Sequence, residues 1–165
     1  DPGGAVGDDS HRNLLKHSQV FEGLTDEQLD RVAALGEVET FPEDAVIVEE
    51  DKAGKSCYFV IQGRVDIEIR SPFGGSDKVQ KIATIKRGEM FGELSLVDGF
   101  LRSASARAAE AIEVLAFENA KLEHLMEEDP RIGYQIMRNV ANVLSSRIRT
   151  TNMKLRNTLS DILYY

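Results

Sequence analysis

The hydrophobic positions along this chain follow two different periods, which predict two kinds of structure. Between Glu37 and Phe117, apolar and polar residues alternate in short runs that are separated by Gly, Pro, Asp and Lys. This alternation is typical of half-buried β-strands. On both sides of this block the apolar residues recur every three or four positions, as in amphipathic helices. We expect a mainly β fold with flanking helices, in which about eight short strands form a jelly-roll-like β-roll.

Turn residues divide the β block into individual strands. The clearest strands are predicted over 45–49, 56–62, 64–70, 79–85 and 112–117. Gln62-Gly63 predicts a tight hairpin turn, residues 72–77 a longer one and residues 86–89 a third, because Gly, Pro, Asp and Ser favour the backbone conformations of turns.

Helix signals precede and follow the strands. A short helix is expected over 12–18, and a second one where Thr25 and Gln28 form a capping box, with Gly36 closing it. Another is predicted over 119–128, after which Asp129-Pro130 has the pattern of an N-cap followed by the first residue of a long final helix.

The final helix carries apolar residues at alternating steps of four and three, which is a heptad seam. Its members are Met137, Ala141, Leu144, Ile148, Thr151, Leu155, Thr158 and Ile162. Such a seam predicts pairing with another helix, which we expect to be a second copy or an effector protein. In the alternative interpretation the same residues cover the β block of their own chain.

With 165 residues, the chain has the length of one domain. We divide it into a flexible N-terminus over 1–10, a β-roll domain with N-terminal helices over 11–130, and a helical region over 131–165 for capping or dimerisation. Apolar residues make up 42% and charged residues 29%, close to the average of globular proteins. No apolar run is long enough to span a membrane, no signal peptide is expected, and the single cysteine, Cys57, favours a reducing cytoplasmic setting in which it is a buried, inert thiol.

Charge is distributed unevenly along the chain. Residues 1–130 carry 14 basic and 27 acidic side chains, whereas residues 131–165 carry 6 basic and 1 acidic. An acidic body argues against nucleic acid as a partner, because phosphate backbones require a clustered basic surface.

Residues for catalysis are few. The three histidines, His11, His17 and His124, stand in or near predicted helices with no second ligand at metal-binding spacing. We expect no metal, no cofactor and no enzymatic activity. A metal-dependent enzyme on a cupin β-roll stays as an alternative that metal analysis distinguishes.

The residues of one segment, 91–108, predict a binding site. Gly92 ends a strand and is followed by Glu93, by a short predicted helical turn over 94–98 and, nine residues after the glutamate, by Arg102. Backbone N–H groups and a guanidinium are suited to a phosphate. A carboxylate repels phosphate, so Glu93 is expected to face a hydroxyl such as a ribose 2′-OH.

The segment resembles the phosphate-binding cassette of the cyclic nucleotide-binding domain family, whose pattern is Phe-Gly-Glu-Leu followed by Ala or Ser and, after a short helix, by Pro-Arg-Ala or Arg-Ser-Ala. The resemblance extends from about Phe21 to Asn152 and includes Phe41-Pro42, the turn over 51–54, residues 58–63 and residues 88–93. It implies a non-enzymatic sensor that binds a cyclic purine nucleotide in a β-roll and responds through its C-terminal helix.

The resemblance assigns the binding roles of the family's cassette to the matching residues of this sequence, and these residues form the candidate site. Glu93 is expected to accept the ribose 2′-hydroxyl, Arg102 to bind the exocyclic phosphate oxygens, and Ser103 to reach phosphate or base. Thr151 or Asn152 is expected to close over the base. The full set is Phe91, Gly92, Glu93, Leu94, Ser95, Arg102, Ser103 and Ala104 in the cassette, Ile47, Ile67, Ile82 and Ile85 as the apolar wall, and Thr151 and Asn152 on the final helix.

The sequence departs from the family pattern at three positions. Leu101 stands in place of a proline and leaves the chain freer there, and Asp44 and Glu50 stand where turn glycines are usual. A serine after the cassette arginine is compatible with either cyclic AMP or cyclic GMP, and we favour cyclic AMP. The remaining alternative is a ligand-free interaction module, in which Glu93 and Arg102 pair with each other and the heptad helix binds a partner.

Overall fold

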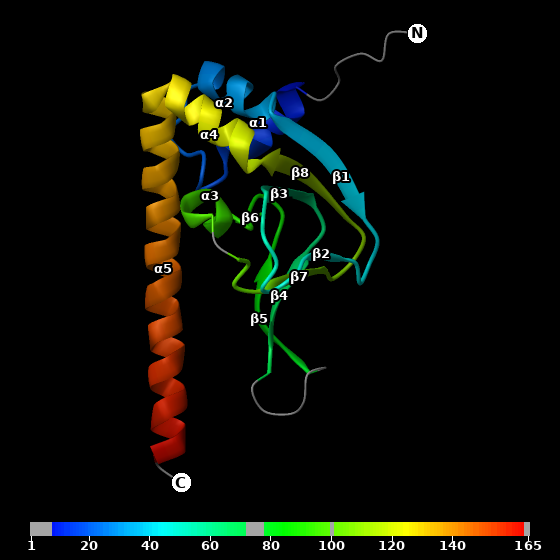
Figure 1. Ribbon diagram of the computed structural model, residues 1–165, viewed down its shortest axis with the longest axis vertical. Coiled ribbons are helices and arrows are strands. Elements are labelled where there is room, and N and C mark those ends of the chain that lie inside the picture. The colour runs from blue at the N-terminus through cyan, green and yellow to red at the C-terminus, as the bar shows by residue number, and fades with distance from the viewer. Residues whose placement is uncertain (1–7, 72–77, 100, 164–165) are drawn as a thin grey trace.

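The computed structural model describes residues 8–71, 78–99 and 101–163 and confirms a mainly β fold with flanking helices (Figure 1). Its helices and strands in chain order are α1 Asp8–Lys16, α2 Asp26–Ala33, β1 Gly36–Phe41, β2 Val46–Val48, β3 Ser56–Gln62, β4 Val65–Arg70, β5 Val79–Ile85, β6 Met90–Phe91, α3 Leu94–Asp98, β7 Ser105–Ala108, β8 Ile112–Glu118, α4 Asn119–Glu128 and α5 Pro130–Leu163. The strands form two four-stranded antiparallel sheets, in the orders β1-β8-β3-β6 and β2-β7-β4-β5.

Two hydrophobic clusters lie on opposite faces of the first sheet. Along β8, Ile112 and Val114 face the second sheet, whereas Leu115 and Phe117 face the helices. This division follows from the period-two geometry of a strand, which sends successive side chains to opposite faces. The helical cluster joins α1, α2, α4 and the start of α5, and all of these elements gather at one end of the molecule (Figure 1).

The predicted helix ends are largely confirmed. The Thr25 hydroxyl accepts from the Gln28 N–H at 3.2 Å, and Gln28 Oε1 accepts from the Thr25 N–H at 3.0 Å, which completes the capping box. Asp129 Oδ1 accepts from the Arg131 N–H at 3.2 Å at the start of α5. Gly36 does not close α2 as expected: it begins β1, where a Cβ would overlap the Leu115 side chain.

The first helix also differs from its prediction, because it covers Asp8–Lys16 rather than 12–18. Residues 8–10 of the predicted flexible N-terminus are therefore helical, and residues 1–7 lie outside the described residues. Acidic residues at a helix N-terminus interact favourably with its dipole, which explains a start at Asp8.

Two of the three predicted hairpins are wrong. Gln62-Gly63 joins β3 to β4, and residues 86–89 join β5 to β6, and in both cases the two strands belong to different sheets. These turns are corners of the roll. The β4–β5 pair is antiparallel as expected, although its turn over 72–77 lies outside the described residues.

The helix α5 runs alongside the β-roll and extends well past the helical cluster (Figure 1). Ile132, Ile136 and Val140 are buried in the helical cluster, and Met137 and Leu144 pack against it. Met137 and Leu144, which belong to the predicted heptad seam, therefore pack against the core of their own chain. From Ser145 to Leu163, all residues are exposed, and they include Ile148, Leu155, Leu159 and Ile162.

Candidate functional site

The cassette is built from a glycine, a short helix and a second glycine. The chain leaves β6 through Gly92 at φ +77°, turns through α3, and leaves α3 through Gly99 at φ +65°. Both are left-handed conformations that glycine adopts at little cost. The predicted helical turn over 94–98 is confirmed by α3.

The Arg102 guanidinium is held by three acceptors of the chain itself, the carbonyls of Gly92 and Ser56 and the hydroxyl of Ser95, which together form its seat. Its Nη1 donates to the Gly92 carbonyl at 2.9 Å and to Ser95 Oγ at 3.0 Å, and its Nη2 donates to the Ser56 carbonyl at 2.5 Å. The residue is only 9% exposed. An arginine side chain has five N–H donors, so these three bonds to described residues leave two for a ligand.

A buried network of hydrogen bonds holds Ser95, one of the acceptors of the Arg102 guanidinium, in place. The Ser95 hydroxyl accepts from Arg102 and from Asn119 Nδ2, the latter at 3.0 Å, and donates to the Gly92 carbonyl at 2.9 Å. These contacts use its one proton and both lone pairs. Asn119 is the first residue of α4, and its Oδ1 is buried with no hydrogen-bond partner among the described residues.

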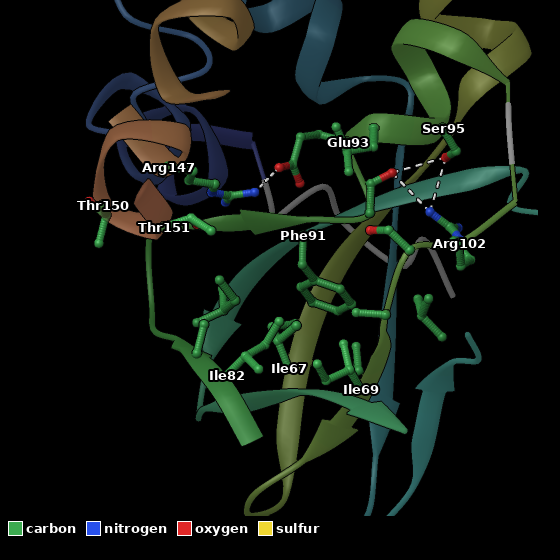
Figure 2. Close-up of a pocket in the computed structure, with 18 of the residues that line it drawn as sticks. Ile67, Ile69, Ile82, Phe91, Glu93, Ser95, Arg102, Arg147, Thr150 and Thr151 are labelled. Atoms are coloured by element: carbon green, nitrogen blue, oxygen red, sulfur yellow. Dashed lines mark hydrogen bonds and ion pairs between the residues drawn. The ribbon is translucent and has the colours of Figure 1, made fainter. Parts of the chain in front are cut away.

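Glu93 belongs to the same cavity but has a different partner from Arg102. Its side chain is 3% exposed and forms an ion pair with Arg147 of α5, through Oε1 and Nη1 (Figure 2). Arg147 also approaches the Met90 carbonyl at 3.4 Å and is 45% exposed. The Glu93–Arg102 pair of the ligand-free alternative is not formed among the described residues, because each side chain has these other partners.

A cavity of about 700 Å³ separates the β-roll from α5 and has the size of a small-molecule site. The cassette forms one wall, aliphatic side chains of the second sheet form another, and α5 closes the third (Figure 2). Twelve of the fourteen predicted site residues line this cavity: Phe91, Gly92, Glu93, Leu94, Ser95, Arg102, Ser103, Ala104, Ile67, Ile82, Ile85 and Thr151.

The structure does not bring the other two predicted residues to the cavity. The register between β2 and β7 shifts between Val46 and Val48, and this bulge breaks the expected alternation. Val48 lines the cavity and is also buried in the cluster between the sheets, whereas Ile47 packs against that cluster and does not line the cavity. Asn152 is exposed on α5, about 100° around the helix from Thr151.

Sequence reasoning missed several lining residues, of which those on α5 matter most. Ser146, Arg147, Thr150 and Lys154 face the cavity together with Thr151. Positions 147, 150, 151 and 154 follow the i, i+3, i+4, i+7 spacing of one helix face. This spacing is visible in the sequence, but nothing there indicates which face of α5 turns toward the strands.

The described residues also bear on metal binding, thiol reactivity and membrane spanning. The described residues contain no group of three or more His, Cys, Asp or Glu side chains that could hold a metal ion. Burial raises the pKa of the Cys57 thiol to about 12, and Glu93 adds to this effect, so the thiol is neutral at physiological pH. None of the described helices is long and apolar enough to cross a bilayer.

Comparison with known proteins identifies the class to which this fold and site belong. The family model of the cyclic nucleotide-binding domain matches residues 38–129. The cyclic AMP receptor protein of Thermus thermophilus is 31% identical over 141 residues, which is 86% of this chain and 62% of that protein. Human cGMP-dependent protein kinase 2 is 29% identical over 103 residues, which is 62% of this chain and 13% of the kinase.

Solved structures agree with the sequence matches. The crystal structure of Thermus thermophilus catabolite activator protein superposes with a TM-score of 0.72 at 31% identity, covering 84% of this chain and 62% of that chain. The chain belongs to the cyclic nucleotide-binding domain family. It spans about three fifths of the length of the bacterial regulators that it matches, and only a small part of the kinase.

Proposed function

We propose that this chain is a regulatory sensor module that binds cyclic AMP, with cyclic GMP as the alternative ligand. In this proposal it is cytoplasmic, is not an enzyme, needs no metal or cofactor, and does not itself bind nucleic acid. The observation that supports it best is the burial of Arg102 and Glu93 at one cavity whose second wall is aliphatic. A cyclic nucleotide needs these three surfaces, for its anion, its ribose hydroxyl and its base.

Each polar part of the ligand has a partner. The exocyclic phosphate oxygens accept from the two N–H groups that Arg102 retains, in charge-assisted hydrogen bonds. Arg147 bonds to Oε1 of Glu93, and the ribose 2′-hydroxyl donates to Oε2. Ser103 then contacts phosphate or base, and Gly92 lies against the sugar and phosphate.

The base occupies the aliphatic end of the cavity. Ile67, Ile82 and Ile85 provide the surface on which it packs, and Thr151 approaches it from α5. Of the two residues proposed as the cap, Thr151 is favoured because it already lines the cavity. Asn152 can take this role only if α5 rotates.

The signal passes through α5. Because the residues of α5 beyond Leu144 are exposed, the Arg147–Glu93 pair is the main polar tie between this part of the helix and the β-roll. A ligand shifts a conformational equilibrium only by contacts that differ between the two states. The same carboxylate binds the ribose and holds α5, so ligand binding and helix position are coupled at Glu93.

The output surface is the exposed apolar stripe on α5, which we propose pairs with a second copy of the chain or with an effector protein. Its members Ile148, Leu155 and Ile162 are seven residues apart and 56–65% exposed. Leu159 continues the stripe in place of the predicted Thr158, because the α5 face that carries Thr151 is turned to the cavity.

Calorimetric titration with cyclic AMP and cyclic GMP tests the site. Arg102→Ala should lose roughly 2–5 kcal/mol of binding, as for loss of one partner of a buried charged pair, which is about 30-fold or more in affinity. Arg87→Ala, at an exposed position on the turn between β5 and β6, is the matched control and should bind as the wild type does. A Kd of Arg102→Ala that stays within threefold of the wild-type value contradicts the assignment.

Glu93→Gln tests the ribose contact separately. It should weaken the binding of cyclic AMP more than that of 2′-deoxy cyclic AMP, because only cyclic AMP has the 2′-hydroxyl that donates a hydrogen bond to the carboxylate. Equal losses for the two ligands refute that role.

A further inference from the structure

Gly54 lies against the Arg102 guanidinium and is not among the residues that line the cavity. A Cβ built on Gly54 would stand 2.7 Å from Nη2 of Arg102, and closer still to Nε and Cζ. Real Cβ atoms do not approach other heavy atoms so closely, so any side chain at position 54 occupies the space that the guanidinium now fills.

The backbone around Gly54 is tied to the backbone of Arg102. The Asp51 N–H donates to the Arg102 carbonyl at 2.9 Å, the Arg102 N–H donates to the Lys52 carbonyl at 2.9 Å, and Ala53 and Leu101 form an antiparallel bridge. These bonds also hold the chain at Leu101, where the family pattern has proline. Because the two segments are joined, the backbone at position 54 cannot easily move away from the arginine, and the flexible side chain must move instead.

We propose that Gly54 is a positioning residue of the phosphate site, whose missing side chain lets the Arg102 guanidinium enter its seat against the carbonyls of Ser56 and Gly92. The inference rests on the proposed function, because the seat matters for binding only if Arg102 holds the ligand's anion. It adds a residue that contacts Arg102 rather than the ligand.

Gly54 is a better test of this seat than the second glycine near the arginine. A Cβ on Gly92 would lie 2.7 Å from Arg102 Nη1, but Gly92 has φ +77°, so any substitution there also strains the backbone. The φ of Gly54 lies outside the left-handed region. The three heavy atoms nearest to an alanine Cβ at position 54 all belong to the Arg102 guanidinium, and the substitution places no side chain in the left-handed region.

The experiment is a double-mutant cycle read by calorimetric titration with cyclic AMP. Gly54→Ala should weaken binding at least tenfold, while Ala53→Ser, an exposed neighbour in the same bridge, should leave the Kd within twofold. In the Arg102→Ala background there is no guanidinium to displace, so adding Gly54→Ala should change the Kd less than twofold. A Gly54→Ala protein that binds as tightly as the wild type, or equal fold-losses in both backgrounds, overturns the inference.

A second measurement needs no ligand. A crystal structure of Gly54→Ala should show Arg102 turned out of its seat, with its contact to the Ser56 carbonyl lost, whereas an arginine still bonded to Ser56 overturns the inference whatever the titrations show. Failure of the proposed function has a different signature, which is a wild-type protein that gives no binding heat with cyclic AMP or cyclic GMP while Gly54→Ala still displaces the arginine.

Discussion

Replacing Arg147 with methionine removes the ion pair between α5 and Glu93 without shortening the helix. The Glu93 carboxylate, 3% exposed, then loses its cationic partner. A unit-charge pair about 4 Å apart is worth ~4 kcal/mol at an effective dielectric constant of about 20. Since Arg147 itself is 45% exposed, solvent screens much of this energy, and we expect a loss of about 1–2 kcal/mol.

For a chain of this length each kcal/mol corresponds to roughly 2–4 °C in Tm. Arg147→Met should therefore lower the calorimetric Tm by roughly 2–8 °C and increase backbone hydrogen exchange along α5 beyond Leu144. Arg149→Met, at an exposed position two residues further along the same helix, is the control and should do neither. A Tm within 1 °C of wild type, together with unchanged exchange in α5, refutes the view that this ion pair anchors the helix.

The same variant also tests the charge balance of the cavity. Without Arg147, the buried Glu93 charge is no longer neutralised and repels the ligand's phosphate, so cyclic AMP affinity should fall. Adding Glu93→Gln removes that repulsion, and the double variant should bind 2′-deoxy cyclic AMP more tightly than Arg147→Met does. No recovery in the double variant contradicts this electrostatic explanation.

Other parts of the chain give further predictions. Leu155→Asp should halve the mass measured by light scattering if the exposed stripe of α5 pairs two copies, and an unchanged dimer mass would exclude the stripe as the interface. Cys57 should react with a thiol reagent at pH 8 about a thousandfold more slowly in the folded chain than after unfolding, because its folded pKa of about 12 exceeds the ordinary value of 9.0. The folded state favours the neutral thiol, so the contribution of Cys57 to the free energy of unfolding is complete below pH 9 and decreases as the pH rises toward 12. Rapid labelling of Cys57 without unfolding would contradict its burial.

Local signals in the sequence predicted most elements of the fold. The capping box at Thr25, the Asp129-Pro130 helix start and the strands 56–62 and 79–85 each depend on neighbouring residues, and the structure contains them. The hairpin predictions failed because a tight turn such as Gln62-Gly63 fixes the chain direction locally. It does not determine whether the next strand joins the same sheet or the facing one.

The two positions where an acidic residue replaces a usual turn glycine differ in backbone conformation. Asp44, in place of a turn glycine, does adopt a positive φ, of +68°. At the next turn the strained residue is Asp51, at φ +64°, rather than the neighbouring Glu50. Both are aspartates, which tolerate this region better than most side chains do.

Within the candidate site, the position of the cassette and of Thr151 could be predicted, but the contact between Arg147 of α5 and Glu93 could not. Glycine, glutamate and arginine stand on one contiguous segment whose spacing fixes their relation to one another. The Arg147–Glu93 contact spans 54 positions and depends on how a long helix packs against the roll. The prediction for Ile47 relied on strict alternation along β2, but the register is irregular there, and Val48 rather than Ile47 lines the cavity.

The most direct test is a crystal structure of the chain with cyclic AMP. It should show exocyclic phosphate oxygens within hydrogen-bonding distance of the Arg102 guanidinium, the ribose 2′-hydroxyl on the Glu93 carboxylate, and the base between the isoleucines of the second sheet and Thr151. A nucleotide bound anywhere else on the surface, with Arg102 still held only by protein carbonyls and Ser95, would contradict the account.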